Sequence, residues 1–168
     1  AGCELMFTAR MCMTLFTLMI EVDRLGYNLI EVNHLISFVT SLEMDMEVVV
    51  LPDAQAIAER AADAIEAVLV AKPNAVLGTA TGSSPLPLYD ELVRRNQAGK
   101  LSFKDVTGYM LDEYVGLPVD HYERYANFME RNLRSRTDMA PGALHGPDAL
   151  NPDPQAACDD YERALAEA

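Results

Sequence analysis

The chain has 168 residues, half of them hydrophobic, which is enough for one domain with a buried core. Its net charge of -13 argues against nucleic acid or an anionic membrane as the main partner, because such polyanions are bound by clustered Lys and Arg side chains. An acidic chain can still bind a small phosphorylated molecule where backbone N–H groups and a few cations outweigh the overall charge.

The cysteines and histidines show neither a disulfide framework nor a metal site. They are Cys3, Cys12, Cys158, His34, His121 and His145. The cysteines lack a C-x-x-C spacing, and the histidines have no second ligand at metal-binding spacing. We therefore predict a cytoplasmic protein without a protein-bound metal.

Residues 1–45 differ in composition from the rest of the chain. The apolar run over residues 11–20 is shorter than the roughly 20 residues needed to cross a bilayer, and no small-residue cleavage signal follows it. We interpret residues 1–45 as a leader, either an upstream extension or a mis-set start, with the domain beginning at Met44 or Met46. A genuine amphipathic arm is the alternative.

From residue 46 onwards, strand and helix patterns alternate. The β-branched run over residues 47–51 predicts a first strand that Pro52 ends. Asp53 is placed to cap a helix that stops at residues 72–73. The predicted inner face of this helix consists of apolar residues at helical spacing. They are Ile57, Ala61, Ala64, Ile65, Val68 and Leu69.

The next segments continue the alternation. A second strand is predicted over residues 75–79, and a turn follows over residues 81–85. A second helix starts at Pro85 or Pro87 and ends near residues 98–99. A third strand covers residues 105–111.

The last part of the chain adds two helices. The third helix is predicted over residues 121–133, with Tyr122 and Tyr125 on its inner face. A brief edge strand at residues 143–145 and a final helix over residues 155–168, capped by Asp153, follow. This order predicts an α/β fold, a Rossmann-like parallel sheet with helices on both faces. The final helix has no C-terminal cap, so we expect a sheet that is incomplete because the chain is cut.

Two adjacent acids, Asp112 and Glu113, stand where the third strand ends, and Gly116 and Pro118 close this segment with turn chemistry. In a parallel sheet, ligands bind beyond the carboxyl ends of the strands, so acids at this position face a crevice. The alternative is that any strand end in solvent collects acids.

The turn after the second strand has the parts of an anion cradle. Its residues are Thr81, Gly82, Ser83 and Ser84. Small residues allow close approach of a ligand, the hydroxyls donate hydrogen bonds, and the following helix offers unpaired N–H groups. The turn is neither a Walker A sequence nor a dinucleotide turn, and an ordinary tight turn is the alternative.

The cradle and the acids should emerge on the same edge of the sheet. A phosphate holder beside a carboxylate base indicates a phosphorylated small molecule that loses a proton. A positioned carboxylate base typically supplies about 10² to 10⁴-fold in rate.

Residues 111–118, Leu-Asp-Glu-Tyr-Val-Gly-Leu-Pro, together with Thr-Gly-Ser-Ser-Pro at 81–85 and the segment 121–125, resemble the glucosamine-6-phosphate deaminase family. The resemblance runs from about residue 46 to residue 168, and its wider group includes 6-phosphogluconolactonase. It implies a Rossmann-like fold and conversion of glucosamine 6-phosphate and water into fructose 6-phosphate and ammonia, without a metal or organic cofactor.

By the same resemblance, Asp112 is the base that moves a proton between C1 and C2 of the open-chain amino sugar. The turn at residues 81–84 holds the sugar phosphate. Glu113 orders the loop or touches the substrate. Tyr125 lies in a lid-like helix, where simple core packing is the alternative to substrate binding.

The family's glycine-rich segment Gly-x-Gly-x-Asp-Gly-His-Ile-x-Phe-Asn-Glu is absent from residues 1–168. We therefore expect an N-terminal fragment that is inactive alone, and a homo-oligomer is an expectation for the full-length protein. A lactonase or another sugar-phosphate enzyme of the same superfamily is the nearest alternative. A non-catalytic sugar-phosphate-binding module is another, although residues 1–45 lack the basic charge of a DNA-binding domain.

Overall fold

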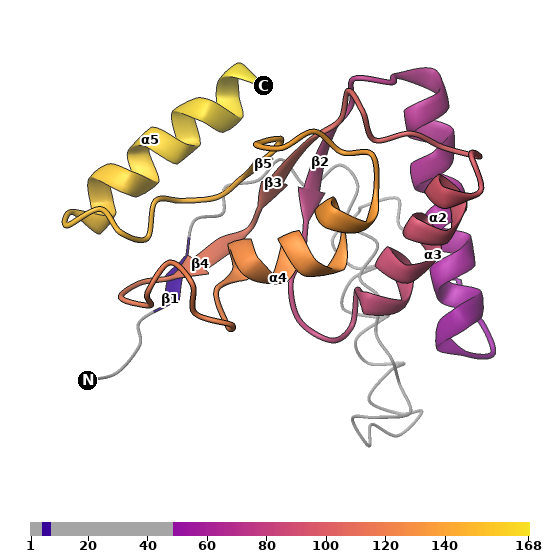
Figure 1. Ribbon diagram of the computed structural model, residues 1–168, viewed down its shortest axis with the longest axis horizontal. Helices are drawn as coiled ribbons and strands as arrows, with labels where there is room; N and C mark the ends of the chain where they lie inside the picture. The colour runs from indigo at the N-terminus through magenta and orange to yellow at the C-terminus, as the bar shows by residue number, and fades with distance from the viewer. Residues whose placement is uncertain (1–4, 8–48) are drawn as a thin grey trace, which may run out of the picture.

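The computed structural model describes residues 5–7 and 49–168, and their fold is α/β, as predicted (Figure 1). The elements in chain order are β1 (Leu5–Phe7), α2 (Ala54–Ala71), β2 (Val76–Thr79), α3 (Leu86–Gln97), β3 (Thr107–Met110), β4 (Asp112–Tyr114), α4 (Tyr125–Asn132), a 3-10 turn (Arg134–Arg136), β5 (Leu144–His145) and α5 (Pro154–Glu167). Apart from residues 5–7, the predicted leader lies outside the described residues. No helix in the described ranges is long and apolar enough to cross a membrane.

The main sheet has three strands in the order β2-β3-β5, and both pairs are parallel. Thr79 lies opposite Met110, so β2 and β3 end at the same level of the sheet. A separate pair joins β4 to β1 in antiparallel orientation. The predicted parallel sheet, including the brief strand at residues 143–145, is therefore confirmed, and the turns after β2 and β3 leave from one edge.

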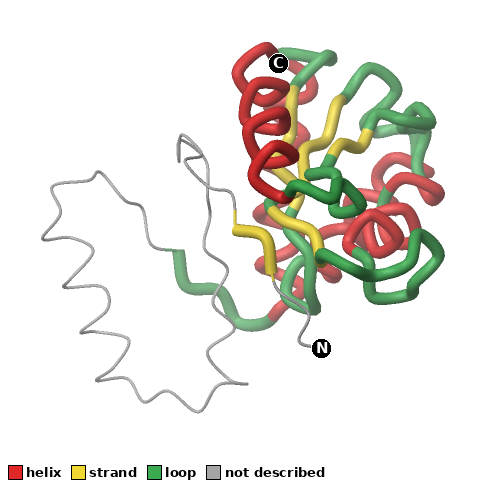
Figure 2. Tube along the Cα trace, turned by 90° about the vertical axis from the view of Figure 1, so that its left-hand side faces the viewer, coloured by secondary structure: helices red, strands yellow, loops and turns green. Residues whose placement is uncertain are grey.

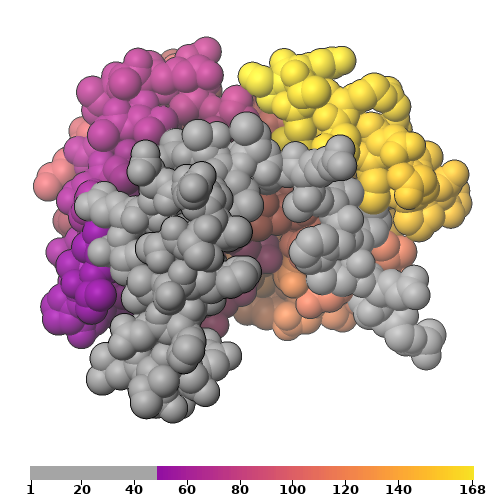
Figure 3. Space-filling model, turned by 180° about the vertical axis from the view of Figure 1, so that it is seen from behind, coloured from indigo at the N-terminus to yellow at the C-terminus, as the bar shows by residue number. Residues whose placement is uncertain are grey.

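The helices flank this sheet, and the tube in Figure 2 shows the strands running among them. Seen from behind, α2 and α5 lie on opposite sides of the molecule (Figure 3). The largest fully buried side chains come from α3, α4, β4 and the loops next to these helices. They are Phe103, Leu92, Met129, Leu133, Glu113 and Val106. All of them are apolar except Glu113, whose role is described below.

Helix α2 begins as predicted, because the Asp53 carboxylate accepts a hydrogen bond from the Ala56 N–H at 2.8 Å. Its buried residues are Ala58, Ala62 and Leu69, and Ile65 packs against the same core. The predicted inner face is thus correct at Leu69 and Ile65 and wrong at Ala64, which is exposed.

An ion cluster joins α2 to α3. The buried Arg95 guanidinium contacts Glu91 Oε1 at 2.7 Å, Glu66 Oε2 at 2.8 Å and Asp63 Oδ1 at 2.8 Å. Hydrogen bonds from Arg94 and then Arg95 lower the pKa of Glu91 to about 2. Because each of these acids is paired with a guanidinium, their charges can be held at the interface of two helices.

The predicted strand over residues 47–51 is wrong for its described part. Residues 47 and 48 lie outside the described residues, while Val49, Val50 and Leu51 form no strand, and Val50 is 88% exposed. A β-branched run becomes a strand only where a neighbouring backbone completes the hydrogen-bond ladder. In the described sheet β2 pairs with β3 alone and stands at the edge.

The third helix starts four residues later than predicted, at Tyr125, and Tyr122 is 67% exposed instead of lying on an inner face. The segment before it forms turns, in which the Asn127 side-chain amide donates to the carbonyls of Val119 and His121 at 2.8 and 2.9 Å. These bonds give the backbone of this segment partners other than a helix.

Helix α5 is capped by Asp153, as predicted, and its Tyr161 is anchored to the sheet. The Tyr161 hydroxyl donates to the Met110 carbonyl at 2.6 Å and lies 3.3 Å from the His145 carbonyl. These carbonyls belong to the last residues of β3 and β5. One side chain therefore fixes both strand ends.

Candidate active site

The turn after β2 and the acids after β3 meet at one edge of the sheet, as the parallel register requires. Tyr89 of α3 donates its hydroxyl to the Ala80 carbonyl at 2.6 Å and so fixes the start of the turn. Gly82 has φ +99°, a conformation that favours glycine. The turn is therefore held at both its entry and its tip.

The rest of the turn faces solvent in front of α3. Ser83 and Ser84 are exposed, and within the described ranges neither hydroxyl bonds to another protein group. Helix α3 begins at Leu86, but Pro85 and Pro87 have no N–H and the Leu86 N–H already donates to the Ser83 carbonyl at 3.3 Å. The anion-binding groups of this turn are therefore its hydroxyls and its own backbone N–H groups, which can bind an anion such as a phosphate.

Asp112 is half-buried at the start of β4. The acids were expected in a loop, but residues 112–114 form a short strand against β1. Burial, and then the charge of Glu113, raise the pKa of the Asp112 carboxyl. A carboxylate whose pKa is raised towards the working pH is a better general base than an ordinary one.

Glu113 is only 1% exposed, and its carboxylate is bound by the start of α4. Its Oε1 accepts hydrogen bonds from the N–H groups of Tyr125 at 2.8 Å and Tyr114 at 2.9 Å. Its Oε2 accepts from the Ala126 N–H at 3.0 Å and lies 3.5 Å from Arg124 Nε. Glu113 thus caps a helix that lies twelve residues further along the chain.

Tyr125, the first residue of α4, brings its hydroxyl to the two loops. It donates to the Tyr114 hydroxyl at 3.0 Å. Burial first, then the hydrogen bond to Tyr114, raise the pKa of Tyr125 to about 12, and the charge of Asp112 adds to this. The Tyr125 hydroxyl therefore lies against Tyr114, on the face of β4 that also carries Asp112.

Tyr125 also packs against the core, so the two interpretations of this residue are compatible. Sequence reasoning missed Tyr114, whose ring centroid lies 4.7 Å from that of Tyr125. The signal that could have found it is strand alternation, which puts residues 112 and 114 on the same face of β4.

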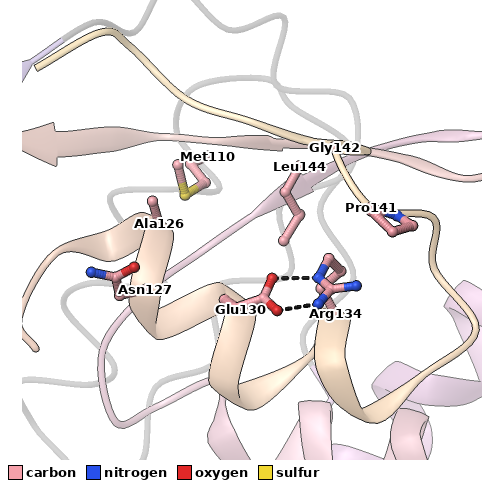
Figure 4. A pocket seen from close by; sticks show the side chains of 8 residues that line it. All are labelled: Met110, Ala126, Asn127, Glu130, Arg134, Pro141, Gly142 and Leu144. Carbon is pink, nitrogen blue, oxygen red and sulfur yellow. Dashed lines mark hydrogen bonds and ion pairs between the residues drawn. The ribbon is translucent and has the colours of Figure 1, made fainter. Parts of the chain in front are cut away.

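A cavity of about 370 Å³ lies beside this region, between α4 and the end of the sheet (Figure 4). Met110 and Leu144 supply apolar walls, and Glu130 and Arg134 bind each other through two hydrogen bonds at its rim. Because Arg134 is already paired, it offers a phosphate no free cation. None of the predicted site residues lines the cavity, so we do not assign the substrate to it.

Comparison with known proteins gives the family. The model of the family "Glucosamine-6-phosphate isomerases/6-phosphogluconolactonase" matches residues 53–168. The chain belongs to this family. The resemblance noted in the sequence is thereby confirmed, and with it the α/β fold.

Curated relatives of this family member are glucosamine-6-phosphate deaminases. The protein from Mycolicibacterium smegmatis is 56% identical over 123 residues, which are 73% of this chain and 47% of the relative. The protein from Beutenbergia cavernae is 53% identical over 120 residues, which are 71% of this chain and 46% of the relative. The chain thus spans about half the length of the curated relatives it matches.

Solved structures agree on the fold. A monomeric glucosamine-6-phosphate deaminase superposes with a TM-score of 0.70 at 32% identity, covering 73% of this chain and 51% of that one. A 6-phosphogluconolactonase from Thermotoga maritima gives 0.58 at 24% identity, covering 70% and 52%. At that identity, the second match shows the fold alone.

Proposed function

We propose that this chain carries the N-terminal part of a glucosamine-6-phosphate deaminase, which converts glucosamine 6-phosphate and water into fructose 6-phosphate and ammonia. The observation that carries the proposal is the convergence of Asp112 with the turn at residues 81–84 on one edge of the sheet. The choice of deaminase over lactonase is supported by 56% identity to the Mycolicibacterium smegmatis deaminase.

In this proposal the turn after β2 receives the phosphate of the substrate. The hydroxyls of Ser83 and Ser84 and the backbone N–H groups of the turn donate hydrogen bonds to its oxygens. The phosphate then fixes the rest of the sugar along the sheet edge towards Asp112. Positioning of this kind turns the following proton transfer into an intramolecular step.

Asp112 is the base of the proposed reaction. In the open-chain sugar, the hydrogen on C2 is acidic because the C1 aldehyde can accept the electrons of the broken C–H bond. The Asp112 carboxylate takes this proton and returns it to C1, which leaves an imine at C2 that water hydrolyses to a ketone and ammonia. Its raised pKa favours the first of these steps, because a more basic carboxylate accepts the C2 proton more readily.

The experiment compares two proteins. One is the chain alone, and the other is the chain joined to the part of the Mycolicibacterium smegmatis deaminase that it does not match, which we name the extended protein. We expect ammonia release from glucosamine 6-phosphate by the extended protein and none by the chain alone. Ammonia release by the chain alone at the rate of the extended protein would refute the proposal that the chain carries only part of the active site.

Asp112→Asn in the extended protein should lower the rate of ammonia release by about 10² to 10⁴-fold. The matched control is Asp120→Asn, which removes an exposed carboxylate from the following turn and should leave the rate unchanged. If the extended protein hydrolyses 6-phosphogluconolactone and releases no ammonia from glucosamine 6-phosphate, the protein is a lactonase and not a deaminase. A cytoplasmic location and a homo-oligomer of the full-length protein stay predictions.

A further inference from the structure

The Glu113 carboxylate has no face left for a ligand. Three backbone N–H groups donate to its two oxygens at 2.8 to 3.0 Å, and Arg124 Nε lies 3.5 Å from Oε2. A carboxylate has about four lone-pair positions, so these groups occupy it. With 1% of the residue exposed, a sugar phosphate at the sheet edge cannot reach it.

Two of the three donors, Tyr125 and Ala126, are the first two residues of α4. N–H groups at a helix start lack partners within the helix, and the positive end of the helix dipole favours a negative charge there. Most helices obtain this cap from the residue just before them. Here Arg124 stands at that position and makes no side-chain cap, so the cap comes from β4.

This arrangement couples the helix to the base. Side chains alternate along a strand, so Asp112 and Tyr114 share one face of β4 while Glu113 points to the other. Glu113 therefore holds the first residue of α4 from the side of the strand away from Asp112. The Tyr125 side chain then extends to the Asp112 face of β4, where its hydroxyl contacts that of Tyr114 at 3.0 Å.

We propose that Glu113 is a positioning residue, which clamps the first turn of α4 to β4 and so places the Tyr125 hydroxyl against Tyr114, on the face of β4 that carries Asp112. The inference rests on the proposed function and deepens it. Glu113 touches no substrate and acts on the proton transfer only through the place of Tyr125. The buried Arg124 Nε has no hydrogen-bond partner among the described residues, but it forms an ion pair with Glu113 Oε2 at 3.5 Å and so belongs to the same clamp.

A double-mutant cycle in the extended protein tests this. Glu113→Gln keeps the size of the side chain, but its NH₂ group replaces one of the two oxygens that accept hydrogen bonds from backbone N–H groups. Tyr125→Phe removes the hydroxyl and keeps the ring. We expect Glu113→Gln to lower kcat by about ten- to a hundredfold, because small displacements of a positioned group cost that much.

The decisive readout is the effect of Glu113→Gln in the Tyr125→Phe background, where we expect less than about a threefold further loss, since coupled residues are not additive. Equal losses in both backgrounds would overturn the inference. Glu123→Gln removes an exposed acid two residues before Tyr125 and should leave kcat unchanged.

Hydrogen exchange of the Tyr125 and Ala126 amides gives a readout that needs neither activity nor the variant's full stability. In the unsubstituted protein both amides should exchange slowly, they should remain slow in Tyr125→Phe, and they should become fast in Glu113→Gln. Fast exchange in the unsubstituted protein would refute the clamp. If that protein releases no ammonia while both amides exchange slowly, the proposed function fails and the clamp of α4 stands as a structural contact without the catalytic role.

Discussion

Replacing Tyr161 by phenylalanine removes one hydroxyl from a side chain that is 6% exposed and joins α5 to two strands of the sheet. The lost contacts are the 2.6 Å hydrogen bond to the Met110 carbonyl and the longer one, 3.3 Å, to the His145 carbonyl. A buried hydrogen bond contributes about 1 kcal/mol net, and a carbonyl left without its donor adds to the loss. We expect the free energy of unfolding to fall by about 1.5 kcal/mol.

Urea unfolding followed by circular dichroism measures this change. With a slope of about 2 kcal/mol per molar urea, the midpoint should fall by about 0.7 M. Tyr122→Phe is the matched control, because that side chain is 67% exposed and its ring stacks only on Arg131. Equal midpoints for the two variants would show that the Tyr161 hydroxyl does not hold the strand ends, and the reasoning would be refuted.

Three further predictions concern ionisable side chains. Arg95→Met should lower the free energy of unfolding by about 3 kcal/mol, because it leaves the buried Glu91 carboxylate with fewer partners. The control Arg60→Met, at an exposed site of α2, should change this free energy little, and urea unfolding measures both variants. The pKa of Glu91 is lowered to about 2, so its contribution is complete above its ordinary value of 4.5 and is lost as the pH falls through about 2; the acid unfolding curve should shift to higher pH in Arg95→Met. Burial raises the pKa of Tyr89 and Tyr161 above their ordinary value of 10. Their contribution to the free energy of unfolding is therefore present below pH 10 and is lost as the pH rises further. Between pH 9 and about 11, the thermal unfolding midpoint should consequently fall less in Tyr161→Phe than in the unsubstituted protein.

The helices were predictable because their signals are local. Asp53 and Asp153 cap the helices that follow them, and each cap depends on residues two or three positions away. The strand over residues 75–79 and its turn were found for the same reason. By contrast, residues 49–51 have the composition of a strand but pair with no other strand among the described residues. Composition alone does not show whether a second strand is available for pairing.

The position of the turn after β2 and of Asp112 on one sheet edge was predictable, and the contacts around them were not. Parallel strands put the turn at residues 81–84 and Asp112 on one edge, and a sequence pattern is enough to deduce that. The start of α4 depends instead on Glu113, twelve residues before Tyr125. No local pattern could show that a buried acid of a strand would supply the cap, so the sequence-based prediction began the helix four residues too early.

The register of Thr79 opposite Met110 also determines where the chain tolerates changes in length. An extra residue within β2 or β3 would displace one of the two turns by about 3.3 Å and reverse the faces of the side chains after it. The start of the connection from α3 to β3 is less constrained, since Gly99 turns the chain with φ +70° and Lys100 is exposed, whereas Phe103 and Val106 further along are buried. Short insertions should therefore be accepted near residues 99–100 and rejected within the strands, so a tag or a reporter can be attached at residues 99–100 without moving the turn at residues 81–84 relative to Asp112.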